Sequence, residues 1–179
     1  MNNYQYQPTW IFKLDARTTH MSLVPLEPAQ QPIFATPNTI QDMLATFSMS
    51  PHTPKEVLSI LELSGHLLVT SVIHYEFAAL AVEKSLQALE LMVRHKVGEA
   101  DRASKVTMAK LVCKLREQTT LRPELDDLLQ DMTRLRNTWV GHPRNAVAFP
   151  LVSAVEFLRH IYEAIAEIAA LHTGYADPA

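Results

Sequence analysis

A long stretch of helix-forming sequence, residues 53–98, constrains the fold more than any other feature of this chain. Thr53, Pro54 and Glu56 predict a helix start, with Thr53 as the N-cap and Glu56 completing a capping box. Gly98 follows basic residues and predicts a helix end, because glycine readily adopts the left-handed conformation that closes a helix. The stretch is therefore expected to be helical throughout, apart from one internal break.

The remaining periodicity predicts an all-α fold. The expected break lies near Ser64 and Gly65, and the helix after it has few wholly polar faces, which indicates burial. Apolar residues at helical spacing predict further helices at about 101–117, from Pro123 onward, and at about 150–172. We therefore expect residues 55–175 to form an up-and-down helical bundle of four to five helices.

Residues 1–54 depart from this pattern and contain most of the prolines. The stretches TWIFKLDA and MSLVPLEP have strand-like composition, but prolines in the second suit an edge strand or an extended arm. PNTIQDMLATF predicts a short helix capped at Asn38 or Thr39. We expect an extended or partly β N-terminal arm with one short helix, packed on the bundle or on a partner.

Composition and charge restrict the class of protein. The one cysteine, Cys113, excludes an internal disulfide, suits a reducing compartment and is expected in the core. The sequence begins without a signal-peptide pattern and has no apolar stretch long enough to span a bilayer, so we expect a soluble cytoplasmic protein. The net charge is −3, but residues 101–145 have nine basic and six acidic side chains. This local excess indicates a polyanionic partner only weakly, because solvated helix faces explain it equally well.

The stretch RLRNTWVGHP, residues 134–143, places polar groups at the end of a leucine-rich helix. Arg136 lies on the apolar side of that helix, where a guanidinium needs an anion or carbonyl oxygens around it. On a straight helix, Arg136 and His142 would be about 120° apart in azimuth and about 9 Å apart in rise. They could meet if the helix unwinds at Gly141 or if a second copy supplies the partner. Pro143 is expected to stop the helix, and a helix end with no catalytic role is the alternative interpretation.

Arginine, asparagine and histidine together suit RNA cleavage without a metal. Histidine titrates near 6.5, so it can take the proton of a 2′-hydroxyl or protonate a leaving 5′-oxygen. The planar fork of arginine suits a phosphate, and asparagine can orient either group. The histidines show no metal-ligand spacing, so we expect neither a metal nor another cofactor.

Two stretches resemble the HEPN family, small helical bundles found in many prokaryotic ribonuclease toxins and defence proteins. Arg136-Asn137-x4-His142 resembles the R-N-x(4)-H form of the family's motif. FAALAVEKSLQALELMV, residues 77–93, resembles its early long helix, in which A-x-E-K-x-L-x-A-L is common. Together with the helical context, the resemblance covers about 55–172 and leaves the N-terminal arm unexplained.

The resemblance implies a homodimer whose two motifs face each other across a cleft. It also implies RNA cleavage to a 2′,3′-cyclic phosphate and a 5′-hydroxyl by a toxin or antiphage-defence effector. Arg136 would bind the scissile phosphate, His142 would be the acid and base, and Asn137 would be the polar residue after the arginine. A cognate antitoxin or a larger defence-system subunit would be the protein partner. Toxins silenced by nucleotidyltransferase antitoxins often have a tyrosine where this chain has Arg144, so that mode of silencing is not expected.

Further residues are assigned supporting roles. Expected RNA contacts come from basic side chains near the motif: Arg144, Arg134, Lys110 and Lys114. Glu83, an acid in a buried helix, could orient Arg136, or it could pair with Lys84. Surface alternatives are solvation of the two lysines and pairing of Arg134 with Asp131 or Gln130. Trp139 is expected in the core or a dimer interface rather than stacked on a base.

Two other functions stay open at this point. A non-catalytic HEPN-like module that binds a nucleotide or protein could assemble with a larger partner through the N-terminal arm. An immunity or antitoxin subunit is the third hypothesis. The ribonuclease requires His142 for its biological effect, whereas a binding module requires the arm instead.

Overall fold

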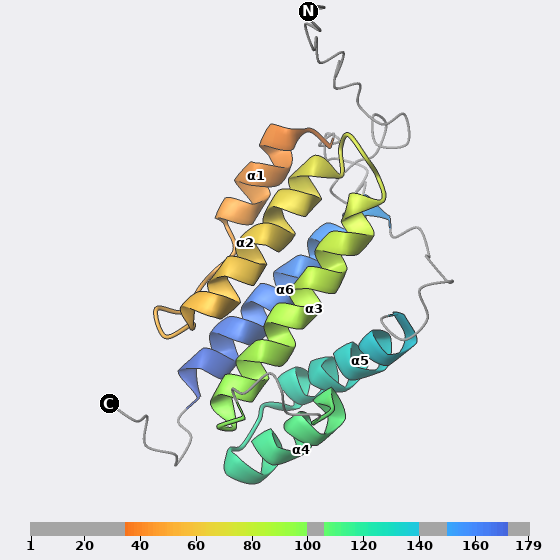
Figure 1. Cartoon of the computed structure of the whole chain (residues 1–179). Coiled ribbons are helices and arrows are strands. Elements are labelled where there is room, and N and C mark those ends of the chain that lie inside the picture. Colours follow the sequence, from red (N-terminus) through yellow and green to blue (C-terminus); the bar gives the residue numbers. More distant parts are fainter. Residues whose placement is uncertain (1–34, 100–105, 140–149, 172–179) are drawn as a thin grey trace, which may run out of the picture.

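The computed structural model describes residues 35–99, 106–139 and 150–171. Within these ranges the chain forms six α-helices and no strand (Figure 1). They are α1 (Pro37–Ala45), α2 (Lys55–Thr70), α3 (Phe77–Lys96), α4 (Met108–Gln118), α5 (Pro123–Trp139) and α6 (Leu151–Ala170). The all-α bundle is confirmed, while the strand-like part of the arm lies outside the described residues.

The helices surround α3. Helix α3 packs against both α2 and α6, and α1 packs on α2 (Figure 1). Helices α4 and α5 lie at an angle across the C-terminal end of α3 (Figure 1). Eleven of the 20 residues of α3 are buried, which confirms the central position that its few polar faces predict. None of the described helices is both long and apolar enough to cross a bilayer.

Apolar spacing explains the packing of α3 and α6. On α6, Leu158, Ile161, Ile165 and Ile168 recur every three or four residues, and all four are fully buried. The Ser64 hydroxyl of α2 donates a hydrogen bond of 2.7 Å to the Ala81 carbonyl oxygen of α3. The most extensive helix contacts of the bundle are those of α3 with α2 and with α6.

The end of α3 is predicted correctly. Gly98 has a φ of 73°, in the left-handed region. Its N–H donates to the carbonyl of His95 at 3.3 Å, and the N–H of Glu99 donates to the carbonyl of Arg94 at 2.9 Å. These two hydrogen bonds form a Schellman motif, which satisfies carbonyls left open at the helix end.

Two predicted helix starts are wrong. The N-cap of α1 is Thr36, whose side chain and backbone exchange hydrogen bonds with Thr39 at 3.1 and 2.8 Å. Helix α2 lacks the capping box, because Pro54 takes the N-cap position with an extended ψ of 144° and the helix begins one residue later. The Thr53 hydroxyl is buried and has no hydrogen-bond partner in the described structure.

The predicted break at Ser64 and Gly65 is also wrong. Helix α2 continues through both residues, and the chain turns at 71–76 instead. A Cβ atom at Gly65 would lie 3.4 Å from Cδ1 of Leu44, which is ordinary van der Waals contact. Gly65 is therefore a buried residue within α2 that faces α1, and it does not end the helix.

Candidate functional site

Arg136 lies in the last turn of α5 and forms an ion pair with α3. Its Nε atom is 2.6 Å from Oε2 of Glu90. The Glu90 side chain is 12% exposed and the Arg136 side chain 31% exposed. The expectation that a guanidinium on this side of the helix has an anion beside it is confirmed.

The same carboxylate binds a second guanidinium. Nε and Nη2 of Arg94, one turn along α3, donate to Oε1 of Glu90 at 3.1 and 2.8 Å. Nη2 of Arg94 also donates to the carbonyl of Val106, two residues before α4, at 2.6 Å. One carboxylate between two arginines leaves the group with a net charge of +1. Together these contacts connect α3 with α5 and with the start of α4.

The ion pair of Arg136 leaves part of its guanidinium unused among the described residues. Glu90 is its one ion-pair partner there, and the nearest contact is made through Nε. Within the described part of the chain the two terminal nitrogens make no hydrogen bond, so their N–H groups can serve other acceptors. A fork fixed at one end and open at the other suits a ligand that offers two oxygens, such as a phosphate.

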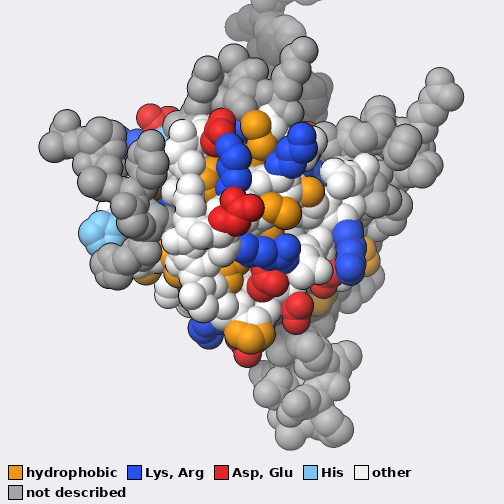
Figure 2. All heavy atoms as spheres, turned by 90° about the horizontal axis from the view of Figure 1, so that it is seen from below, with side chains coloured by type: hydrophobic (Ala, Val, Ile, Leu, Met, Phe, Trp, Pro, Cys, Tyr) orange, Lys and Arg blue, Asp and Glu red, His pale blue; other side chains and the backbone are white. Residues whose placement is uncertain are grey.

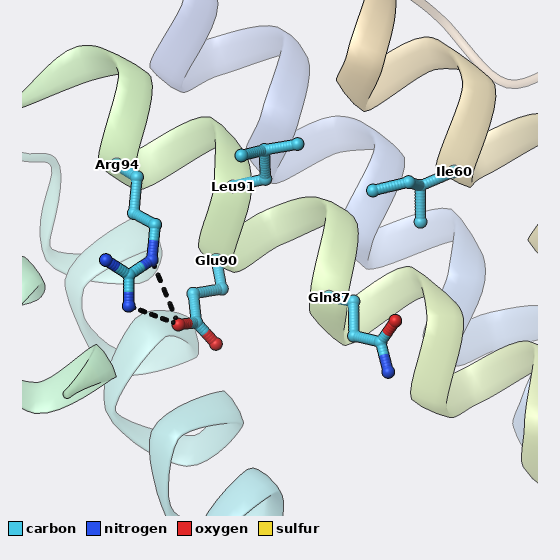
Figure 3. A pocket seen from close by; sticks show the side chains of 5 residues that line it. All are labelled: Ile60, Gln87, Glu90, Leu91 and Arg94. Carbon is cyan, nitrogen blue, oxygen red and sulfur yellow. Dashed lines mark hydrogen bonds and ion pairs between the residues drawn. The ribbon is translucent and has the colours of Figure 1, made fainter. Parts of the chain in front are cut away.

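A hollow of about 240 Å³ adjoins this ion-pair group. It is lined by Ile60 of α2 and by Gln87, Glu90, Leu91 and Arg94 of α3. Figure 3 shows Gln87, Glu90 and Arg94 projecting from the same side of α3, while Ile60 comes from the neighbouring helix. The carboxylate that anchors Arg136 is thus part of the wall of the hollow.

Glu83 does not supply the anion beside Arg136, which is Glu90, two turns further along α3. Glu83 instead accepts a hydrogen bond of 3.0 Å from Nε2 of Gln87. The sequence feature that pointed to Glu90 is its four-residue spacing from Arg94, which is typical of an ion pair within a helix. This spacing does not show that α5 crosses α3 beside Glu90.

The motif is described only in part. Asn137 is exposed on α5 beside Arg136, and Trp139 is the last residue of that helix. His142 and Arg144 lie outside the described residues, so their expected roles remain predictions. The structure thus places the arginine of the motif, and its relation to the histidine stays an expectation.

The other described residues that are expected to contact RNA lie on the surface. Nη1 of Arg134 is 3.2 Å from Oδ1 of Asp131, and both side chains are at least two-thirds exposed, so the pairing alternative is confirmed. Lys114 pairs with Glu99, and Lys110 is exposed. Figure 2 views the end of the molecule where α4 and α5 lie and shows basic and acidic side chains interspersed. The visible described surface there is not a continuous basic track.

The expectation that Cys113 lies in the core is wrong. Its side chain is exposed on α4. The apolar face of α4 is formed by Leu111, Val112 and Leu115, which are buried. A residue next to Val112 in a helix is rotated by about 100°, and this turns Cys113 toward solvent.

Comparisons with known protein families, with curated proteins and with solved structures give no match to this chain. The site is accordingly defined by its own geometry. A half-buried arginine is anchored by a carboxylate, a second arginine neutralises that carboxylate, and a small hollow lies beside them.

Proposed function

We propose that this chain is a metal-independent endoribonuclease of the HEPN type, acting in the cytoplasm as a toxin or antiphage-defence effector. The observation that carries the proposal is the Arg136 guanidinium, which Glu90 anchors at Nε and whose terminal nitrogens make no hydrogen bond to the described residues. A guanidinium held at Nε can direct its two terminal nitrogens at two oxygens of a phosphate.

The electrostatics favour an anionic ligand. Glu90 lies against Arg136 and would by itself repel a phosphate. Arg94 offsets that charge through two hydrogen bonds to the same carboxylate, so the group keeps one net positive charge. Glu90 is therefore a positioning residue in this proposal, since it acts on the phosphate only through Arg136.

The proposed reaction needs no redox partner and no metal. The 2′-oxygen attacks the adjacent phosphorus while a base takes its proton, and the bond from phosphorus to the 5′-oxygen breaks as that oxygen receives a proton. The products are a 2′,3′-cyclic phosphate and a 5′-hydroxyl. His142 is proposed as the acid and base, Arg136 as the group that stabilises the charge on the phosphoryl oxygens, and Asn137 as an orienting residue.

The proposed active unit is a homodimer, in which both copies contribute to one cleft. Leu63 of α2 and Leu80 of α3 are 46% and 41% exposed, and they lie on the two helices that line the hollow. A second copy that covers them would remove apolar surface from water. Light scattering on the full chain should give twice the monomer mass, and a double change of both leucines to glutamate should give the monomer.

Growth after induction tests the proposal. Wild type, Arg136→Ala and His142→Ala should be compared at matched expression levels, with Arg159→Ala as the control, because Arg159 is an exposed arginine on α6 with no proposed contact to RNA. Wild type and Arg159→Ala should arrest growth and produce RNA with new cyclic-phosphate ends, and the other two variants should not. If all four behave alike, the ribonuclease proposal fails and a binding module is the better account.

A further inference from the structure

We propose that the hollow beside Arg136 binds an adenine base, so that the chain prefers RNA with adenine next to the cleaved bond. The preference in cleavage rests on the proposed ribonuclease function, whereas binding of an adenine nucleotide does not. The inference comes from three observations: the size of the hollow, the fixed orientation of the Gln87 carboxamide in its wall, and the spacing along α3 between Gln87 and the arginine group.

The size and walls of the hollow suit a single base. Its volume of about 240 Å³ is below the roughly 300–1,000 Å³ of sites for drug-sized ligands. Ile60 and Leu91 come from different helices and offer aliphatic surface for the faces of a planar ring. The polar lining groups, Gln87, Glu90 and Arg94, all project from one side of α3 (Figure 3).

The Gln87 carboxamide has a fixed orientation. Its Nε2 donates to Oε1 of Glu83 at 3.0 Å, and its Oε1 accepts from Nζ of Lys84 at 3.1 Å. A carboxylate can only accept and an ammonium group can only donate, so the reversed amide would lose both hydrogen bonds. Glu83 and Lys84 therefore determine which end of the amide is the donor and which is the acceptor.

The fixed amide retains one N–H and one oxygen lone pair. This pair matches adenine, which presents an amino donor beside a ring-nitrogen acceptor, and glutamine is one of the two side chains that commonly bind adenine in this bidentate way. Glu83 and Glu90 flank Gln87 along α3 and disfavour uracil, whose edge is richer in carbonyl oxygens. Guanine is more commonly read by arginine or lysine through its two acceptors, and Arg94, which lines the hollow, has its Nε and Nη2 bonded to Glu90 and to the Val106 carbonyl. Cytosine offers one edge with an amino donor beside a ring nitrogen, whereas adenine offers that pair on two edges. Adenine is thus the base that this set of groups favours.

The spacing of residues along α3 allows one nucleotide to contact both Gln87 and Arg136. Gln87 and Arg94 are seven residues apart on α3, so they lie on nearly the same face, about 10 Å apart along the axis. Glu90 lies between them and holds Arg136. A nucleotide whose base contacts Gln87 can therefore place its phosphate toward the open fork of Arg136.

The test measures binding and cleavage separately. Binding of 5′-AMP, 5′-GMP, 5′-CMP, 5′-UMP and inorganic phosphate would be measured by calorimetry on the full His142→Ala chain, alone and combined with Gln87→Ala or Gln87→Glu. Gln130→Ala is the matched control, because Gln130 also bonds an acid four residues earlier on its own helix. Circular dichroism would confirm that every variant is folded.

We expect 5′-AMP to bind about 5- to 150-fold more tightly than the other nucleotides, the range expected of one bidentate base contact. Both Gln87 variants should lose this preference, and Gln130→Ala should keep it. Equal binding of the four nucleotides, or a preference that survives Gln87→Ala, would overturn the inference.

Cleavage by the wild-type chain distinguishes this inference from the proposed function. Cuts that cluster beside adenine, and lose that clustering in Gln87→Ala, support both. Cleavage at positions that do not depend on adenine supports the ribonuclease proposal and overturns the base preference. If 5′-AMP binds through Gln87 but no RNA is cut, the adenine site stands and the ribonuclease proposal fails.

Discussion

Replacing Glu90 with glutamine tests the ion-pair group most sharply, because this change keeps the shape and removes the charge. Breaking a buried ion pair by removing one partner costs roughly 3–5 kcal/mol, whereas an exposed pair contributes about 0–1 kcal/mol. Arg94 and Glu90 are 10% and 12% exposed, close to the buried case, but Arg136 is 31% exposed and can turn to water. Glutamine also keeps one acceptor oxygen for Arg94. We therefore expect a loss of about 2–3 kcal/mol, between these limits.

Thermal unfolding measures this loss. For a chain of this size, roughly 2–4 °C of Tm accompanies each kcal/mol, so the Tm of Glu90→Gln should fall by about 4–12 °C. Glu156→Gln is the control, since Glu156 pairs with Arg159 three residues away and both side chains are more than 40% exposed. That variant should stay within about 0.5 kcal/mol of wild type.

A double-mutant cycle with Arg136→Ala separates the contact between α3 and α5 from the rest. The two changes should couple by more than about 0.5 kcal/mol, because the residues are in direct contact. Additive effects, or a Glu90→Gln variant as stable as Glu156→Gln, would refute the reasoning that this carboxylate holds α5 on α3.

Three further predictions concern other parts of the fold. Gly98→Ala should destabilise the chain by about 1–2 kcal/mol in urea unfolding, because alanine is strained at a φ of 73°; an unchanged midpoint would contradict the Schellman assignment. Hydrogen bonds from Arg122, at 2.8 and 2.5 Å, hold the pKa of Glu167 below its ordinary value of 4.5. The stability that this pair contributes is present above pH 4.5 and is lost as the pH falls through the lowered pKa of Glu167 in the folded chain. Glu167→Gln should therefore lower the free energy of unfolding at neutral pH and weaken its decline in acid. An equally steep decline in wild type and variant would count against the pair. Cys113 should react with a thiol reagent in the folded chain without prior unfolding, and protection until unfolding would contradict its exposure.

Helix content was predictable because it follows from local periodicity. The apolar residues of α6 recur at helical spacing, and Gly98 after a basic turn ends α3 as predicted. Helix starts were less predictable, because the pair Thr-Pro occurs before both α1 and α2. Thr36 forms a capping box and Thr53 does not. The two cases differ in backbone geometry, which the local sequence does not specify.

The arginine of the site was predictable, but its partners were not. The position of Arg136 on an apolar helix face required an anion or carbonyl oxygens around it, and helix α3 supplies an anion. Whether Glu90 or Glu83 contacts Arg136 depends on where α5 crosses α3. That crossing point depends on side-chain packing across the whole bundle. The hollow beside Gln87 likewise forms between two helices, so no single segment of the sequence encodes it.

The central claim is that Arg136 belongs to a ribonuclease site, and the chemistry of the RNA ends tests it most directly. Purified full-length chain would be incubated with a mixed-sequence RNA in the presence of a metal chelator, beside Arg136→Ala, His142→Ala and the control Arg159→Ala. We expect wild type and Arg159→Ala to generate 2′,3′-cyclic phosphate and 5′-hydroxyl ends, and the other two variants to generate none. Ends that appear equally in all four preparations, or in none of them, would contradict the account.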